Sequence, residues 1–208
     1  MIIKMLTVGP IMANCYIIGC ERTKLCAVID PGGDEQDILM ALAKLHLTVK
    51  YILNTHGHFD HVGGNKGLKD ATGAEILIHA QDAPMLGGPS PMAFGMGVKS
   101  SPPPDRIIQD GDTIEFGDIT LSVIHTPGHT PGGVSFLTQG AVFVGDTLFA
   151  GSVGRTDFPG GNFETLAHSI QKKLFVLGDD VVVYPGHMGP TKIGEERKYN
   201  PFVGADTL

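Results

Sequence analysis

Short apolar segments rich in β-branched residues recur along the first part of the chain, separated by amphipathic ones. Such runs, bounded by turn residues, are typical of strands, and we predict strands at Ile2–Val8, Cys15–Ile18, Leu25–Ile29, Val49–Leu53 and Glu75–His79. Apolar residues at helical spacing, with Asp and Glu in the first turn, predict a helix over Asp34–Leu45. A weaker pattern predicts another helix over Gly64–Ala71.

The second half of the chain repeats this order. We predict strands at Thr113–Phe116, Ile119–His125, Val134–Leu137, Ala141–Val144 and Val181–Tyr184, and helices at Phe163–Leu174 and near Glu195–Lys198. Because each half contributes strands followed by a helix, the pattern indicates two sheets packed face to face with helices outside. The chain has 208 residues, and we expect residues 1–208 to form one domain.

Regular patterning fails between Pro84 and Pro104, where Gly, Pro and Met dominate. A linker is one interpretation. We favour an ordered surface loop that covers another part of the molecule, because the segment holds three methionines and a phenylalanine and has regular elements on both sides.

Composition and charge narrow the class of protein and its partners. The 29 glycines and 14 prolines indicate many tight turns and disfavour a helical bundle. A net charge of −7 repels phosphate backbones and anionic membranes, and we find no basic patch that offsets it. No segment approaches the ~20 apolar residues of a membrane span. We therefore expect no nucleic-acid partner and no membrane partner.

The three cysteines, Cys15, Cys20 and Cys26, are an odd number in a long chain, which fits a reducing compartment rather than a disulfide framework. We expect buried strand thiols rather than a zinc site. The segment before Gly9-Pro10 is too short for the core of a signal peptide. These features predict a cytoplasmic protein.

The candidate chemistry lies first in the pattern H-x-H-x-D-H, formed by His56, His58, Asp60 and His61 directly after a predicted buried strand. Residues two apart in an extended chain point the same way, so His56 and His58 can bind one ion together. As the chain turns into a helix, Asp60 and His61 face a neighbouring point. Imidazole and carboxylate are ligands that suit zinc, and iron or manganese less exclusively.

Three later loops that follow predicted strands supply further candidate ligands. His129 stands in a Pro/Gly-rich turn that begins at His125, Asp146 stands in Gly-Asp-Thr-Leu-Phe, and His187 ends Tyr-Pro-Gly-His. A turn aspartate can instead cap backbone amides, and a histidine beside glycine can simply be exposed. We expect His46, His79 and His168 to be structural or solvated, and His125 at most to shape its loop.

These four motifs, in this order, resemble the metallo-β-lactamase superfamily, and within it the glyoxalase II-like (hydroxyacylglutathione hydrolase) group in its short bacterial form. The resemblance spans nearly the whole chain and implies an α+β fold, an αββα four-layer sandwich. It implies a first metal on His56, His58 and His129, a second on Asp60, His61 and His187, and Asp146 bridging both. Asp30 matches the family's early aspartate, which hydrogen-bonds to the ligands, although an Asp-Pro-Gly turn is the alternative interpretation.

The main functional hypothesis is hydrolysis of a thioester such as S-D-lactoylglutathione, with two divalent ions, zinc foremost, activating a bridging water. Asp60 and Asp146 are then the carboxylates of the catalytic centre. A thiolate leaves without much protonation, so no dedicated general acid is required. Arg155, Lys192, Arg197 or Lys198 can pair with a substrate carboxylate, and surface solvation is the alternative role; of these, Arg155 is our substrate candidate.

Two features leave alternatives open. Full-length glyoxalase II continues into a helical domain with glutathione contacts, whereas about twenty residues follow His187 here. The string from Gly154 to Phe158 also resembles a loop of iron-dependent persulfide dioxygenases. One alternative is therefore iron-dependent oxidation of a persulfide. A second is hydrolysis of a lactone, phosphodiester or RNA by the same fold, and a third is a metal-binding module without activity.

Overall fold

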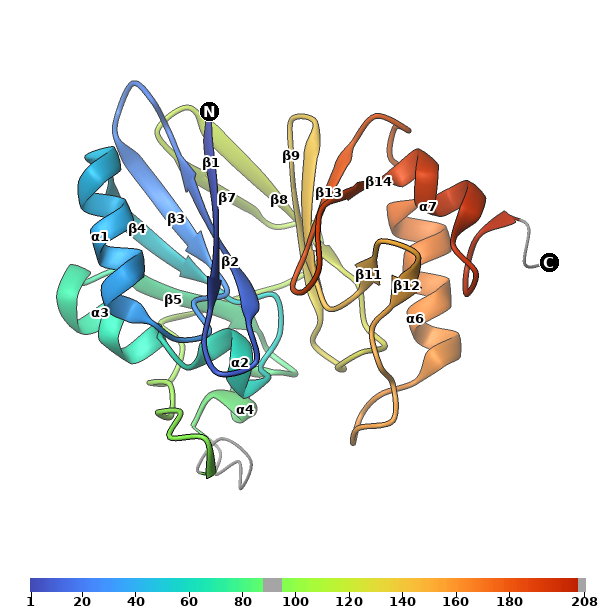
Figure 1. Ribbon diagram of the computed structural model, residues 1–208, viewed down its shortest axis with the longest axis horizontal. Coiled ribbons are helices and arrows are strands. Elements are labelled where there is room, and N and C mark those ends of the chain that lie inside the picture. The colour runs from blue at the N-terminus through green and yellow to red at the C-terminus, as the bar shows by residue number, and fades with distance from the viewer. Residues whose placement is uncertain (88–94, 206–208) are drawn as a thin grey trace.

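The computed structural model describes residues 1–87 and 95–205, and two six-stranded sheets form its centre (Figure 1). The first sheet has the order β1-β2-β3-β4-β5-β6, with strands at Ile2–Val8, Ala13–Gly19, Leu25–Ile29, Thr48–Leu53, Glu75–His79 and Arg106–Ile108. The second has the order β14-β13-β10-β9-β8-β7. In chain order its strands are β7 Thr113–Phe116, β8 Ile119–His125, β9 Val134–Thr138, β10 Ala141–Gly145, β13 Val182–Pro185 and β14 Thr191–Lys192. A small ribbon pairs β11, Leu148–Phe149, with β12, Ser152–Val153.

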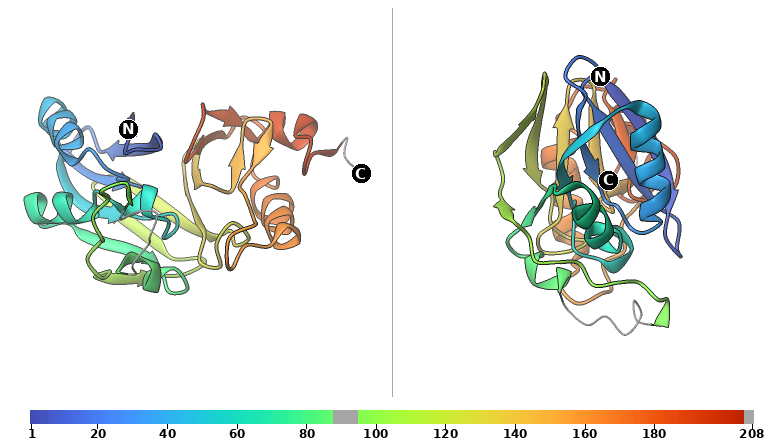
Figure 2. Two further views of the ribbon diagram at one scale, coloured as in Figure 1. Left: turned by 60° about the horizontal axis from the view of Figure 1, so that its bottom comes forward. Right: turned by 90° about the vertical axis from the view of Figure 1, so that its left-hand side faces the viewer.

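Helices cover the outer face of each sheet, which gives the predicted αββα sandwich (Figures 1 and 2). Helices α1 (Glu35–Leu45) and α3 (Asn65–Thr72) pack on the first sheet, and α6 (Phe163–Ser169) and α7 (Ile193–Tyr199) pack on the second. The π-helical turn η1, Ile170–Leu174, continues α6. Two short helices, α2 (Phe59–Val62) and α4 (Ala83–Leu86), follow β4 and β5.

Alternation along the strands distributes apolar side chains between three cores. In β2, Tyr16 and Ile18 enter the core between the sheets, whereas Ile17 packs toward the helices of the first sheet. In β10, Phe143 enters the same central core and Val142 packs against α6. Because both faces of these strands are covered, their sequences are continuously apolar rather than alternating.

The predicted elements are all present, with shifted ends at several of them. Strand β2 begins two residues earlier than predicted and α7 is longer than its predicted core. Strand β6 was not predicted, because it has three residues of which only Ile108 is buried. All three cysteines are buried, as expected; Cys15 lies in β2 and Cys26 in β3, whereas Cys20 directly follows β2.

Strand direction brings the candidate ligands to one edge of the sandwich. Strands β3, β4 and β5 run parallel, as do β10 and β13, and β8 shares the direction of β10 through the antiparallel β9. The loops that follow β3, β4, β8, β10 and β13 therefore meet at the same edge.

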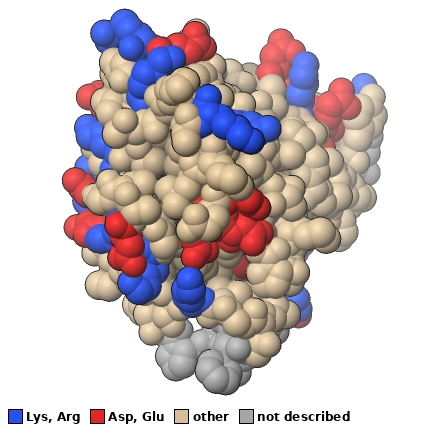
Figure 3. Space-filling model, turned by 60° about the vertical axis from the view of Figure 1, so that its left-hand side comes forward, with Lys and Arg blue, Asp and Glu red and all other residues tan. Residues whose placement is uncertain are grey.

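Within the two described stretches, no helix has the length and apolar character needed to cross a membrane. On the face shown in Figure 3, basic and acidic side chains are intermixed and separated by broad uncharged areas. The absence of a nucleic-acid partner stays a prediction.

Candidate metal centre

Three histidines from two loops form a first triad of potential ligands. His56 and His58 follow β4, and His129 lies between β8 and β9. Their ligand atoms lie within 4.8 Å of one another. His58 Nδ1 is 2.9 Å from His129 Nε2, and the ring centroids of His56 and His129 are 4.9 Å apart. The structure thus brings these three predicted residues together.

Asp60, His61 and His187 form a second triad, again with ligand atoms within 4.8 Å. Asp60 and His61 lie on α2, and His187 follows β13. Asp60 Oδ2 is 3.2 Å from His187 Nε2 and 3.3 Å from His61 Nε2. The α2 turn therefore directs Asp60 and His61 to a point distinct from that of His56 and His58, as the pattern predicted.

Asp146, directly after β10, lies between the two triads. Its Oδ1 is 3.5 Å from His61 Nε2, and its Oδ2 is 3.6 Å from His129 Nε2 and 3.7 Å from His187 Nε2. One carboxylate thus faces imidazoles of both triads, which is the geometry that a bridging ligand requires.

Among the described residues, three buried ligand atoms have no hydrogen-bond partner: His56 Nε2, His61 Nε2 and Asp146 Oδ1. Buried polar atoms are nearly always satisfied, so each of these needs an explanation. Ligands at 2.0–2.2 Å from a tetrahedral metal lie about 3.4 Å apart, and the separations from 2.9 to 3.7 Å given above scatter around that value. The residues present fit two divalent cations.

Asp30 orients the imidazole of His61 directly and that of His56 through Thr55, by hydrogen bonds on their Nδ1 sides. Its Oδ2 accepts from the Thr55 hydroxyl at 2.6 Å and from His61 Nδ1 at 3.1 Å, and its Oδ1 accepts from the Thr55 amide at 2.8 Å. The Thr55 hydroxyl in turn lies 3.0 Å from His56 Nδ1. With Nδ1 hydrogen-bonded in both rings, His56 and His61 present Nε2 to the centre, as outer carboxylates of metal sites commonly ensure.

The charges of the site favour cation binding. Burial, and then the neighbouring His129, lowers the pKa of His58 to about 4. Burial also holds the pKa of His56 well below its usual range, with His61 and His58 adding to the effect. Burial opposes ionisation of Asp60, but the charge of His61 and the hydrogen bond from His187 outweigh it and lower the Asp60 pKa. At neutral pH, Asp60 is therefore a carboxylate, and His56 and His58 are neutral, which is the form that binds metal.

The remaining predicted residues lie at or beyond the edge of the site. Arg155 pairs through its guanidinium with Asp157 and stacks on Phe158, at 3.8 Å to the ring centroid. Lys192 pairs with Asp180, and Arg197 with Asp179. The four other histidines are not in either triad; His79 and His125 stack on each other with centroids 4.3 Å apart.

The described parts of the Pro84–Pro104 segment pack near the ligand loops. A Cβ on Gly57 would lie 2.7 Å from Met85 Cβ, and one on Gly63 would lie 2.6 Å from Val98 Cγ1. Ser101 is buried and donates its amide to the Leu86 carbonyl. The middle of the segment, residues 88–94, lies outside the described residues.

Sequence reasoning missed two groups that touch the ligand loops. The backbone carbonyl of Arg155 lies 2.7 Å from His129 Nδ1 and orients that ring. Asp82, fully buried, accepts hydrogen bonds from both loops of the first triad. A backbone carbonyl gives no signal in the sequence. Asp82 stands in no motif, and its place three residues after the predicted strand Glu75–His79 is a weak hint.

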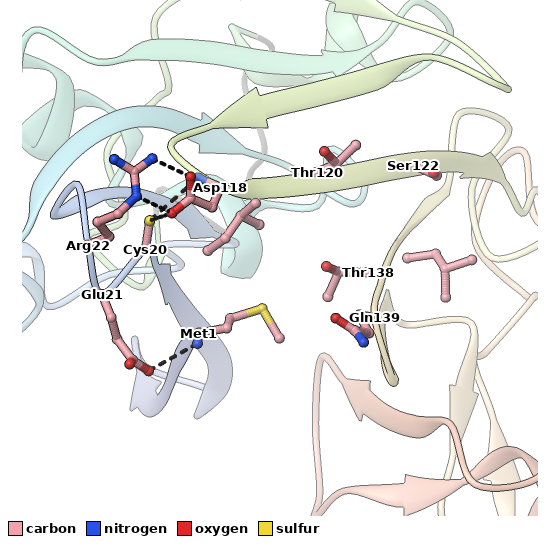
Figure 4. Close-up of a pocket in the computed structure, with 11 residues that line it drawn as sticks. Met1, Cys20, Glu21, Arg22, Asp118, Thr120, Ser122, Thr138 and Gln139 are labelled. Carbon is pink, nitrogen blue, oxygen red and sulfur yellow. Dashed lines mark hydrogen bonds and ion pairs between the residues drawn. The ribbon is translucent and has the colours of Figure 1, made fainter.

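A separate cavity of about 750 Å³ opens at the opposite edge of the sandwich, beside the turns after β2 and β7 (Figure 4). Its charged groups pair with one another: Arg22 with Asp118, and the Met1 amino group with Glu21 at 3.0 Å. It holds no group of clustered ligands, so the metal centre is the candidate functional site.

Several curated relatives match this chain over nearly its whole length. The chain is 37% identical over 209 residues to the hydroxyacylglutathione hydrolase GloC of Haemophilus influenzae, covering 98% of both chains.

Three solved structures are similar throughout. BLEG-1, a B3 metallo-beta-lactamase, superposes with a TM-score of 0.92 at 35% identity, covering 97% of this chain and 99% of that one. TTHA1623 in a di-iron-bound form superposes with a TM-score of 0.87 at 35% sequence identity, covering 96% of this chain and 99% of that one. ETHE1 from Myxococcus xanthus superposes with a TM-score of 0.82 at 33% sequence identity, covering 98% of this chain and 84% of that one.

The model of the metallo-beta-lactamase superfamily matches residues 8–187. That range begins at the end of β1 and ends on His187, so it contains every residue of both triads together with Asp146. This chain belongs to the metallo-beta-lactamase superfamily.

Proposed function

We propose that this protein is a dinuclear metallohydrolase that cleaves hydroxyacyl thioesters of the S-D-lactoylglutathione kind. The observation that carries the proposal is Asp146, whose two oxygens face His61 of one triad and His129 of the other. The two triads and Asp146 would hold two divalent cations, zinc foremost and iron or manganese as alternatives, and these would lower the pKa of a bound water from 15.7 toward ~7 and so supply hydroxide.

The chain's own residues then hold and shield the centre. His56 and His61 are almost fully buried, whereas His58 and His187 are partly exposed, so substrate approaches from the side of the latter two. Phe158 packs edge-on against His58, and Phe149 lies near His187 with centroids 6.4 Å apart. These two rings offer apolar surface to the acyl or thiol part of a substrate.

The leaving group favours a thioester over other esters. A thiol has a pKa near ~8.5, so a thiolate departs without a proton. An alkoxide or amide nitrogen needs a donor in the transition state. The side chains at the two triads are the candidate ligands themselves, and Asp30 and Thr55 hydrogen-bond on the side of the imidazoles that faces away from the centre. The whole-length similarity to GloC supports the same substrate class.

Persulfide oxidation is the second candidate, favoured by the Gly154–Phe158 string and by the similarity to ETHE1. It needs one iron on a subset of the ligands, so His61 and His187 are then dispensable. The complete triad of Asp60, His61 and His187 supports the hydrolase instead.

The deciding experiment compares His187→Ala with wild type. Purified protein is assayed with S-D-lactoylglutathione under nitrogen, with glutathione persulfide at an oxygen electrode, and with a β-lactam. We expect thioester hydrolysis in the wild type, a loss of at least 100-fold in His187→Ala, and one ion fewer per chain. His46→Ala, at the end of α1, is the matched control and keeps full activity. Oxygen uptake retained in His187→Ala would establish the dioxygenase and refute the proposal.

A further inference from the structure

Asp82 is a buried carboxylate that lies outside the ligand set but touches both loops of the first triad. It lies between β5 and α4 and has 0% exposed surface. Its Oδ2 accepts from the Gly57 amide at 3.0 Å and from the Thr130 hydroxyl at 2.7 Å, and its Oδ1 accepts from the Gly132 amide at 2.7 Å. A buried carboxylate is costly unless such donors surround it.

The donors are the immediate neighbours of the three ligands. Gly57 stands between His56 and His58, and Thr130 follows His129. The first loop extends from β4 of one sheet and the second from β8 of the other, so Asp82 joins the two halves of the sandwich at the point where the triad forms. His58 and His129, 2.9 Å apart, lie on the two loops that meet at this junction.

The backbone of both loops approaches Asp82 closely at two glycines, Gly57 and Gly132. A Cβ on Gly132 would lie 2.6 Å from Asp82 Oδ1 and 2.6 Å from the Asp82 nitrogen, and one on Gly57 would lie 2.9 Å from the Asp82 carbonyl oxygen. Only glycine permits so close an approach at these two positions. Asp30 supports His61 and, through Thr55, His56, and the Arg155 carbonyl orients His129. Each of these groups acts on the ligands of one loop, whereas Asp82 accepts hydrogen bonds from both loops of the first triad.

We propose that Asp82 is a positioning residue of the first triad: by holding Gly57 and Thr130 on one carboxylate, it sets the distance between His58 and His129 and hence the affinity for the ion bound there. This inference rests on the proposed dinuclear centre. Loss of hydrogen-bonding partners behind metal ligands typically weakens metal binding by about 10- to 100-fold.

The test measures metal release from the loaded full-length protein, dialysed against graded concentrations of a chelator. In wild type we expect two zinc ions per chain. In Asp82→Asn, where an amide NH₂ replaces one acceptor oxygen, we expect one ion to be released at a 10- to 100-fold lower chelator concentration and the other to be retained as in wild type. Asp105→Asn is the matched control: Asp105 also accepts from a backbone amide, that of Ile76, but lies away from the triads and leaves both ions unchanged.

A second pair covers the case in which Asp82→Asn does not fold. Thr130→Val removes the hydroxyl donor and keeps the shape, so it should weaken one ion selectively, whereas Thr130→Ser restores wild-type retention. Two ions held with wild-type affinity in Asp82→Asn, or in Thr130→Val where the former does not fold, would overturn the inference and leave the proposed function intact. Loss of both ions in proportion to unfolding would also overturn it. A wild-type chain that holds fewer than two ions refutes the proposed centre itself.

Discussion

Gly186 provides the sharpest single-atom test of the bridging geometry. A Cβ added at this position would lie 2.2 Å from Asp146 Oδ1 and 2.7 Å from His61 Cε1. Ordinary contacts between such atoms are about 3.5 Å, so Gly186→Ala must push the carboxylate away by about 1 Å. The backbone cannot retreat, because the Gly186 amide donates to the Gly145 carbonyl at 2.8 Å and its carbonyl accepts from the Asn14 amide at 2.7 Å.

A misplacement of about 1 Å at a reacting centre costs roughly 100-fold in rate, which corresponds to about 2.7 kcal/mol in the activation free energy. We therefore expect Gly186→Ala to lower kcat/KM for S-D-lactoylglutathione by about 100-fold and to reduce metal retention. Gly189→Ala is the matched control, since a Cβ there meets nothing within 4 Å. Two retained ions in Gly186→Ala, with a rate near that of Gly189→Ala, would show that the position of the Asp146 carboxylate does not control metal binding or the rate.

Two further predictions concern buried groups near the sheets. Asp30 has a φ of 50°, which Asn tolerates as well as Asp, so Asp30→Asn alters only charge and hydrogen bonding. We expect this variant to bind metal about 10- to 100-fold more weakly at the triad that contains His61, as measured by chelator competition. Unchanged metal binding would contradict the orienting role of Asp30. Burial raises the pKa of Cys26 to about 12 from 9.0, so the native thiol stays protonated while the unfolded chain ionises above pH 9. Stability should fall as pH rises from about 9 toward 12, by up to about 1.4 kcal/mol per pH unit. Urea midpoints at pH 8 and pH 10 should show a smaller fall in Cys26→Ala, and equal falls in both proteins would contradict this assignment.

Much of the sandwich could be predicted because its strands are covered on both faces. Continuous apolar runs such as that of β2 are recognisable without knowing their neighbours. The three-residue β6, with one buried side chain, carries too little pattern, and its pairing with β5 is a property of the assembled sheet.

The convergence of the candidate ligands could be predicted because the spacing is local at H-x-H-x-D-H and because the later candidates follow recognisable strands. Groups that orient the ligands could be predicted only in part. Asp30 belongs to a motif, whereas Asp82 reaches Gly132 fifty residues away, and no local pattern connects the two. The contact of the Arg155 side chain with substrate stays a prediction; that side chain pairs with Asp157, while the Arg155 carbonyl orients His129.

If seven side chains hold two adjacent cations through a shared carboxylate, crystals of the metal-loaded protein, measured at the absorption edge of the bound metal, will reveal both ions. We expect two anomalous peaks about 3.5–4 Å apart, one among His56, His58 and His129 and the other among Asp60, His61 and His187, with Asp146 between them. A single peak, or peaks away from Asp146, would exclude a bridged pair of ions.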